Sequence, residues 1–231
     1  MDVRLRKETK IGERQLGFRR GVGTREAFAS LSSLILQSKH KRKPLIAAFV
    51  DFSKAFDTVL REKMLQRLKD EGVSQADIHM IHSMYCNVTA RVDGGDKCLS
   101  EGAGVKQGDP LSPLLFLLFI NNLHKALSSE NQQQSGNEGR SALKPVKLSS
   151  TLIESIGYAD DLVLFAHSAA DLQERLQRLE VYCNEHGLTV NLKKTKILRL
   201  SSPDPLIEPD SESPLLFSME GRLSMLIDTN T

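Results

Sequence analysis

Two adjacent carboxylates, Asp160 and Asp161, lie between the apolar segments 153–157 and 162–166. This pattern predicts a β-hairpin that buries its apolar side chains and carries its polar groups to the rim of a sheet. One interpretation is ordinary turn chemistry, because Asp tolerates turn conformations and bonds its own backbone. A third carboxylate, Asp51, favours another interpretation, since it also follows a strand-like apolar segment. Three acids at the ends of core strands are suitable ligands for a metal ion.

Asp51 interrupts residues 45–52, which are otherwise apolar and predict a strand buried on both faces. Leaving a carboxylate unpaired there would cost several kcal/mol, so a cation or strong hydrogen-bond donors should lie close. The simpler alternative is an ion pair between Asp51 and Lys54 or Arg61. Carboxylate oxygens suit Mg²⁺, with Mn²⁺ as an alternative ion. Two such ions about 3.5 to 4 Å apart support in-line phosphoryl displacement, so the inferred chemistry is nucleotidyl transfer.

The elements that would position these acids follow from the periodicity. Helices follow the strand over 45–52, and a hairpin over 153–166 comes next. The helix after the hairpin has a buried stripe from Leu172 to Cys183 and ends at Gly187, and residues 188–192 and 197–200 form the last strand. This order predicts an α+β fold, a ferredoxin-like β-α-β-β-α-β antiparallel sheet with helices on one face. The first strand and the hairpin are neighbours in that topology, so Asp51 should meet Asp160 and Asp161.

Two further regions carry weaker signals. Residues 102–113 combine glycines with Lys106, Gln107 and Asp109, which would let the backbone approach a bound molecule. The same composition also fits a long flexible loop. Residues 114–127 predict one helix, with Ser112 as its N-cap. Residues 128–152, rich in Ser, Gln, Asn and Gly, predict a flexible surface loop.

Composition describes a soluble globular protein of 231 residues, large enough for one domain. Residues 1–43 hold twelve Lys or Arg against four acids, a difference of +8, whereas the Pro-rich residues 201–231 are acidic and predict disorder. A basic segment suits an anionic partner, although a merely solvated basic face fits equally well. Three isolated cysteines fit a reduced intracellular protein. The longest apolar run, residues 114–120, is too short to span a membrane, so no membrane partner is expected.

Five segments of the chain form recognisable motifs. They are Phe49-Val-Asp51-Phe-Ser-Lys-Ala-Phe56-Asp57, Lys106-Gln107-Gly108-Asp109-Pro110-Leu-Ser-Pro113, Tyr158-Ala-Asp160-Asp161, Gly187-Leu-Thr-Val-Asn191-Leu-Lys-Lys194-Thr195 and Gln15-Leu-Gly17-Phe18-Arg19-Arg-Gly21-Val-Gly-Thr24-Arg-Glu-Ala27. The first four resemble, in order and spacing, the palm motifs of reverse transcriptases. The fifth, N-terminal segment, together with Gln-Gly-Asp-Pro at 107–110, points to the non-LTR (LINE-type) retrotransposon branch, with group II intron maturases as the next closest relatives. The resemblance covers about residues 14–200.

The resemblance implies a polymerase palm over residues 44–200, preceded by a basic remnant of the fingers over 1–43. It further implies that Asp51, Asp160 and Asp161 hold two Mg²⁺ ions, with the Phe52 carbonyl assisting.

Five other positions match family motifs. Phe56 matches a steric gate against a ribose 2′-OH, although a core Phe is the alternative. Gln107 and Gly108 match the lining of the nucleotide pocket, and Tyr158 matches the position beneath the primer end. Lys194 matches a proton donor to pyrophosphate, although a solvated lysine fits nearly as well.

The implied activity is RNA-directed DNA polymerisation, with an RNA template, a DNA primer and deoxynucleoside triphosphates as partners. Upstream finger segments, the primer grip, the thumb and an endonuclease domain have no counterpart in the chain, so a truncated fragment is expected. The alternative function is that of a catalytically impaired, nucleic-acid-binding remnant of a transposable element. For that function, the affinity for RNA should fall steeply with salt.

Overall fold

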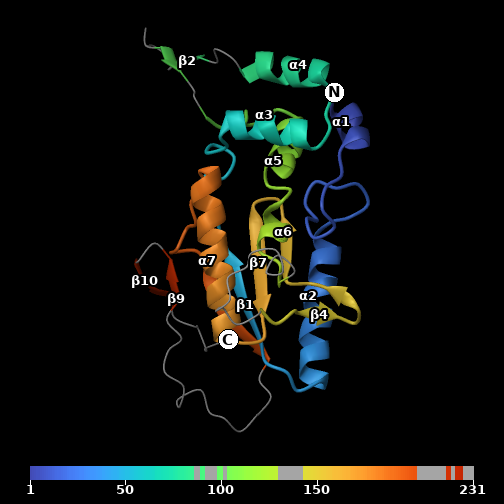
Figure 1. Ribbon diagram of the computed structural model, residues 1–231, viewed down its shortest axis with the longest axis vertical. Helices are drawn as coiled ribbons and strands as arrows, with labels where there is room; N and C mark the ends of the chain where they lie inside the picture. The colour runs from blue at the N-terminus through green and yellow to red at the C-terminus, as the bar shows by residue number, and fades with distance from the viewer. Residues whose placement is uncertain are drawn as a thin grey trace, which may run out of the picture.

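The computed structural model describes residues 1–85, 103–129 and 143–201, together with the backbone of four short strands in the remaining parts (Figure 1). The helices are α1 (Asp2–Glu8), α2 (Thr24–His40), α3 (Arg61–Asp70), α4 (Gln75–Tyr85), α5 (Ser112–Phe119), α6 (Leu123–Ala126) and α7 (Ala169–His186). The strands are β1 (Leu45–Val50), β2 (Thr89–Arg91), β3 (Cys98–Ser100), β4 (Lys147–Leu148), β5 (Thr151–Leu152), β6 (Ser155–Tyr158), β7 (Asp161–Ala166), β8 (Lys196–Ser201), β9 (Phe217–Met219) and β10 (Arg222–Met225).

The central sheet has four strands in the order β6-β7-β1-β8, and each neighbouring pair is antiparallel. β1 thus lies between the second strand of the hairpin and the last strand of the sheet. This is the strand order of the β-α-β-β-α-β arrangement, and it confirms the predicted α+β, ferredoxin-like fold.

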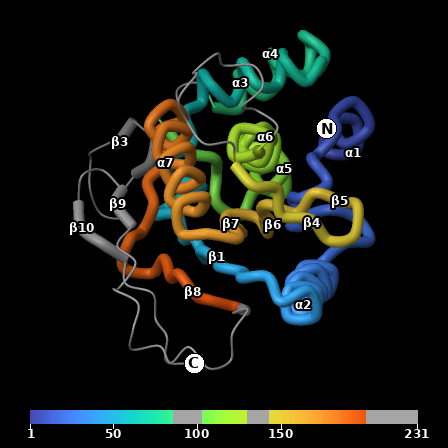
Figure 2. Tube along the Cα trace, turned by 60° about the horizontal axis from the view of Figure 1, so that its bottom comes forward, coloured from blue at the N-terminus to red at the C-terminus, as the bar shows by residue number. Residues whose placement is uncertain are grey.

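The two faces of β1 are buried against different layers, as its continuous apolar sequence requires. Ile46, Ala48 and Val50 belong to the larger core with α3, α5 and α7, whereas Leu45 and Ala47 belong to a smaller core with α2. Figure 2 shows α5, α6 and α7 on one side of the sheet and α2 on the other. The helices α5, α6 and α7 therefore share one face as expected, and α2, from the preceding basic segment, partly covers the other.

Local signals set the N-termini of α4 and α7 and the C-terminus of α7. The Ser168 hydroxyl accepts a hydrogen bond from the Asp171 N–H at 3.1 Å, and Gly187 ends α7 with φ of +68°. Ser74 caps α4 in the same way, through the Asp77 N–H at 3.2 Å. These caps set where α4 begins and where α7 begins and ends.

The structure corrects several element boundaries. The helix predicted over 114–127 is broken into α5 and α6, because the Asn121 side chain at the break bonds the Gly12 N–H and the Lys10 carbonyl. Leu111, rather than Ser112, is the N-cap residue of α5. The strand predicted over 188–192 is reduced to a single bridge at Val190, and β8 begins at Lys196 after a turn.

Part of the predicted loop 128–152 is ordered. β4 and β5 pair as a short hairpin, and Leu143 and Val146 are buried because their apolar side chains reach the core. Residues 130–142 lie outside the described residues. In the predicted disordered tail, β9 and β10 pair, and residues 202–216, 220–221 and 226–231 lie outside the description. No described helix has the length and apolarity that crossing a membrane requires.

Candidate active site

The register of β1 against β7 brings Asp51 and Asp161 to facing positions. Val50 pairs with Leu162, the last pair of the β1–β7 ladder. One step further in the same antiparallel register, Asp51 stands opposite Asp161. Asp160 is the adjacent residue of the turn between β6 and β7. The backbone register therefore brings the three predicted acids to the same end of the two central strands, β1 and β7.

The charges of these acids affect one another. The pKa of Asp161 is raised, first by burial of its carboxyl group and then by the negative charges of Asp160 and Asp51. Within the described ranges, no group of three or more His, Cys, Asp or Glu side chains is gathered closely enough to ligate one metal ion. The donor chemistry still suits a hard divalent cation, since the three carboxylates repel one another and a cation would relieve that repulsion.

Asp51 is held from the side of β8. The Asn191 N–H donates to the Asp51 carbonyl at 2.7 Å, and the Asp51 N–H donates to the Thr195 hydroxyl at 3.2 Å. The Lys194 ammonium lies 3.8 Å from Asp51 Oδ2, and the lysine side chain is 69% exposed. Lys194 is therefore a cation that the structure places beside Asp51.

Phe52 follows Asp51 and bridges to Val190. The flanking hydrogen bonds run from the Ser53 N–H to the Thr189 carbonyl and from the Asn191 N–H to the Asp51 carbonyl. In such a pair the central residue directs its own N–H and C=O to the opposite side. The Phe52 carbonyl therefore faces the side on which β7 and its acids lie.

The glycine-rich loop packs on the turn that follows Asp51. The Val105 N–H donates to the Phe56 carbonyl at 2.9 Å, and Gln107 Nε2 donates to Asp57 Oδ1 at 3.0 Å. Gly108 has φ of +82°, a conformation that favours glycine. The Phe56 ring is half-buried and stacks on Phe116, with ring centroids 4.4 Å apart. Predicted nucleotide-binding residues and the carboxylates therefore flank the same turn.

Tyr158 and Asp161 are the last pair of the β6–β7 hairpin, and Tyr158 is half-buried beside the acids. Between them, Ala159 has φ of +58°, which is uncommon for a residue with a side chain. Gln15 bonds both backbone groups of Ala159. The sequence patterns missed the roles of Gln15 and Thr195, because both act on backbone groups 144 positions away.

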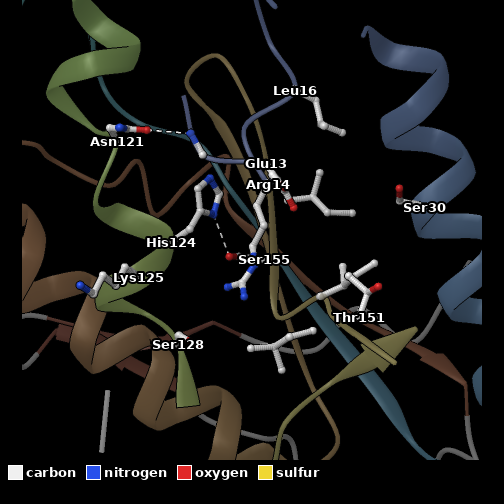
Figure 3. A pocket seen from close by; sticks show the side chains of 14 residues that line it. Glu13, Arg14, Leu16, Ser30, Asn121, His124, Lys125, Ser128, Thr151 and Ser155 are labelled. Carbon is white, nitrogen blue, oxygen red and sulfur yellow. Dashed lines mark hydrogen bonds between the residues drawn. The ribbon is translucent and has the colours of Figure 1, made fainter. Parts of the chain in front are cut away.

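A separate cavity of about 710 Å³ lies between the segment 12–16, α6 and the start of β6. Figure 3 shows His124, whose Nδ1 is 2.8 Å from the Ser155 hydroxyl, and Asn121, whose Oδ1 accepts from the Gly12 N–H. Ser155 and Ile156 line this cavity at the beginning of β6, whereas the acids follow the end of that strand. The cavity is therefore distinct from the carboxylate site.

Residues 1–215 match the profile of a family described as reverse transcriptase (RNA-dependent DNA polymerase). The chain belongs to the reverse transcriptase family. Two relatives are Pol polyproteins of the type-1 retrotransposable element R2. The protein from Bradysia coprophila is 31% identical over 74% of this chain, and that from Nasonia vitripennis is 30% identical over 89%. These relatives confirm the predicted non-LTR retrotransposon branch.

This reverse transcriptase domain spans about a fifth of those two relatives, 18% and 20% of their lengths. Its fold also matches that of a telomerase from Candida albicans solved with a TWJ fragment of telomeric RNA. The TM-score is 0.55 at 12% identity, over 94% of this chain and 34% of the telomerase chain. This likeness supports a polymerase-palm fold for the domain.

Proposed function

We propose that this domain adds deoxynucleotides to the 3′-hydroxyl of a DNA primer under the direction of an RNA template. The observation that carries the proposal is the β1–β7 register, which brings Asp51 opposite Asp161 with Asp160 beside them. In a chain of the reverse transcriptase family, three converging acids suit nucleotidyl transfer. Residues 44–200 would form the palm, and the basic residues 1–43 would form part of the fingers.

Asp51, Asp160, Asp161 and the Phe52 carbonyl would hold divalent cations, and we propose two Mg²⁺ ions. When bound, such ions supply positive charge that stabilises the attacking and leaving oxygens of phosphoryl transfer. The orientation of the Phe52 carbonyl and the mutual repulsion of the acids both favour this role.

The other residues around the acids would bind and orient the substrates. Gln107 and Gly108 would contact the incoming nucleotide, since their loop rests on the turn after Asp51. Phe56 would exclude a ribose 2′-OH, and its stacking on Phe116 would keep the ring in place. Tyr158 would lie beneath the primer end.

Lys194 would donate a proton to the leaving pyrophosphate. Its ammonium group is exposed, so it can reach a substrate, and it lies 3.8 Å from Asp51 Oδ2. That position is close enough to the acids to serve the same reaction.

The experiment is primer extension on an RNA template with Mg²⁺ and deoxynucleotides. The wild type should extend the primer, and the double variant Asp160→Asn/Asp161→Asn should not. Asp70→Asn is the matched control, because Asp70 pairs with Gln66 and Arg67, two side chains of its own helix α3. Product formed by the double variant would contradict the proposed site.

RNA binding without chemistry is the second candidate function. Several cations of the N-terminal segment are exposed and available to phosphates: Lys7, Lys10, Arg20, Arg25, Lys39. Salt-dependent RNA binding by a wild-type chain that extends no primer would favour this alternative. A weak salt dependence would count against it.

A further inference from the structure

The side-chain amide of Gln15 is bonded to the turn that carries the two adjacent acids. Gln15 Nε2 donates to the Ala159 carbonyl at 3.0 Å, and the Ala159 N–H donates to Gln15 Oε1 at 2.9 Å. The same Oε1 also accepts from the Gly17 N–H at 3.1 Å. Gln15 is 3% exposed, so these bonds form away from water. One amide therefore satisfies both backbone groups of the residue that precedes Asp160.

The turn needs such support. Ala159 has φ of +58°, a left-handed conformation that its Cβ disfavours. Asp160 and Asp161 follow directly, and their charges repel each other. Both effects favour rearrangement of the turn, and hydrogen bonds to both the N–H and the carbonyl of Ala159 oppose it.

The backbone around Gln15 pairs with β6, an edge strand of the sheet. Gln15 bridges Gly157 in parallel, with the Leu16 N–H donating to the Gly157 carbonyl at 2.7 Å and the Gly157 N–H donating to the Arg14 carbonyl at 2.8 Å. The fit is tight, since a Cβ on Gly17 would lie 2.2 Å from the Ala159 nitrogen. The pairing with Gly157 therefore fixes the position of Gln15 relative to the Ala159 turn.

Two side chains hold this segment from the other side. Arg19 Nη1 donates to the Glu13 and Gln15 carbonyls, each at 3.2 Å. Asn121 Oδ1 accepts from the Gly12 N–H at 2.9 Å (Figure 3). The backbone of the segment that carries Gln15 is thus also held by contacts outside the Ala159 turn.

We propose that Gln15 is a positioning residue of the carboxylate site: its amide fixes Ala159 and so keeps Asp160 and Asp161 opposite Asp51. This inference rests on the proposed function for the role of the acids. Gln15 itself touches no reacting atom. Its loss should weaken cation binding and catalysis through disorder of the turn, with the rest of the sheet intact.

The test uses the full 231-residue chain with Gln15→Met, which keeps the length of the side chain and removes both hydrogen-bonding groups. Gln15→Asn keeps the amide group on a side chain that is shorter by one methylene. It replaces Gln15→Met in the test if Gln15→Met does not fold. Gln66→Met is the matched control, because Gln66 is exposed on α3 and bonds Asp70 within the helix. Circular dichroism and thermal unfolding verify that each variant folds.

Two measurements need no catalytic activity. The first is amide hydrogen exchange by NMR, where we expect the Ala159 N–H of the variant to exchange at least about tenfold faster while the Leu164 N–H, within β7, is unchanged. The second is Mn²⁺ binding followed by water-proton relaxation. Removing a residue that orients metal ligands typically costs about 10-fold to 100-fold in affinity, and we expect a loss in this range for Gln15→Met. Gln66→Met should match the wild type in both.

Unchanged Ala159 exchange together with unchanged Mn²⁺ affinity in folded Gln15 variants would overturn the inference. Primer extension separates it from the proposed function. A wild type that extends primers, beside a Gln15→Met variant with the same rate and the same Mg²⁺ requirement, would refute the positioning role alone. A wild type without activity would refute the function, and the exchange and Mn²⁺ measurements would still decide the role of Gln15.

Discussion

The Asp51 N–H donates to the Thr195 hydroxyl at 3.2 Å, and that hydroxyl donates to the Asn191 carbonyl at 2.9 Å. Thr195 is buried, with 3% exposure. The Asn191 N–H in turn bonds the Asp51 carbonyl. The turn before β8 thus holds the backbone of Asp51 on the side opposite β7.

Thr195→Val should destabilise the chain by about 1 to 3 kcal/mol, because it leaves the Asp51 N–H without its acceptor in a partly buried place. The rate of primer extension should also fall, since the Asp51 backbone loses the hydrogen bond that helps to hold it in place. Thr195→Ser keeps the hydroxyl and should restore most of both properties. Urea unfolding and extension rates measure the two effects. Wild-type stability in Thr195→Val would show that this hydrogen bond contributes nothing.

Asp161 should make stability depend on pH. Burial first, and then the charges of Asp160 and Asp51, raise the pKa of Asp161 above its ordinary value of 3.8. The folded chain therefore keeps this proton to higher pH than the unfolded chain. The resulting stabilisation is fully present below pH 3.8 and is lost as pH rises through the higher folded pKa.

Asp161→Asn should accordingly stabilise the chain at pH 7, by about 0.5 kcal/mol or less because the side chain is largely solvated. Relative to the wild type, the gain should disappear near pH 3. Urea unfolding at the two pH values measures it. A gain of equal size at both values would point to a cause other than charge.

His124 should make stability depend on pH in the opposite direction. Burial, followed by the Arg14 cation, lowers the pKa of His124 from 6.5 to about 4. The unfolded chain takes up a proton near pH 6.5 and the folded chain does not, so stability present above pH 6.5 is lost as pH falls to about 4. The difference corresponds to on the order of 3 kcal/mol.

His124→Gln should remove this acid-sensitive part of the unfolding free energy. Exposed His79→Gln is the matched control and should keep the wild-type profile. Unfolding measured between pH 7 and pH 4 gives the three curves. If His124→Gln follows the wild-type curve throughout, His124 does not carry the dependence.

Arg175 and Glu154 form a buried ion pair, 2.6 Å between Nη2 and Oε1, with both side chains essentially unexposed. Arg175 also donates to the Leu127 and Lys144 carbonyls. Burial alone would raise the pKa of Glu154, but the Arg175 charge, the Arg175 hydrogen bond and the hydrogen bonds from Ser129 together outweigh burial and lower it. Arg175→Met should therefore cost about 3 to 5 kcal/mol, since it leaves a buried charge unpaired.

Arg178→Met is the control on the same helix, where the partly exposed pair with Glu174 should contribute no more than about 1 kcal/mol. The double variant Arg175→Met/Glu154→Leu should recover much of the loss, because it leaves no unpaired charge. Chemical denaturation measures all of these changes. A double variant as unstable as Arg175→Met would show that the cost lies in packing.

The amino-acid sequence alone determined the order of the elements and the faces of β1, because apolar periodicity records which side chains are buried. It also located the helix end at Gly187, where neighbouring residues decide the geometry. The three acids were found because each follows an apolar strand-like segment. Local patterns and short motifs were sufficient for these features.

Only the tertiary structure decided what holds the acids in place. Gln15 meets Ala159, and Thr195 meets Asp51, across 144 positions of the chain in both cases. Such contacts depend on strand order and register, which arise when distant segments pack together. Side-chain bonds to backbone groups also leave no periodic signal. Gln15 and Thr195 lie in segments that resemble family motifs, but those motifs do not indicate which backbone groups the two side chains bond. The residue types of the site indicated its chemistry, whereas the pairing of distant strands set the positions of its carboxylates.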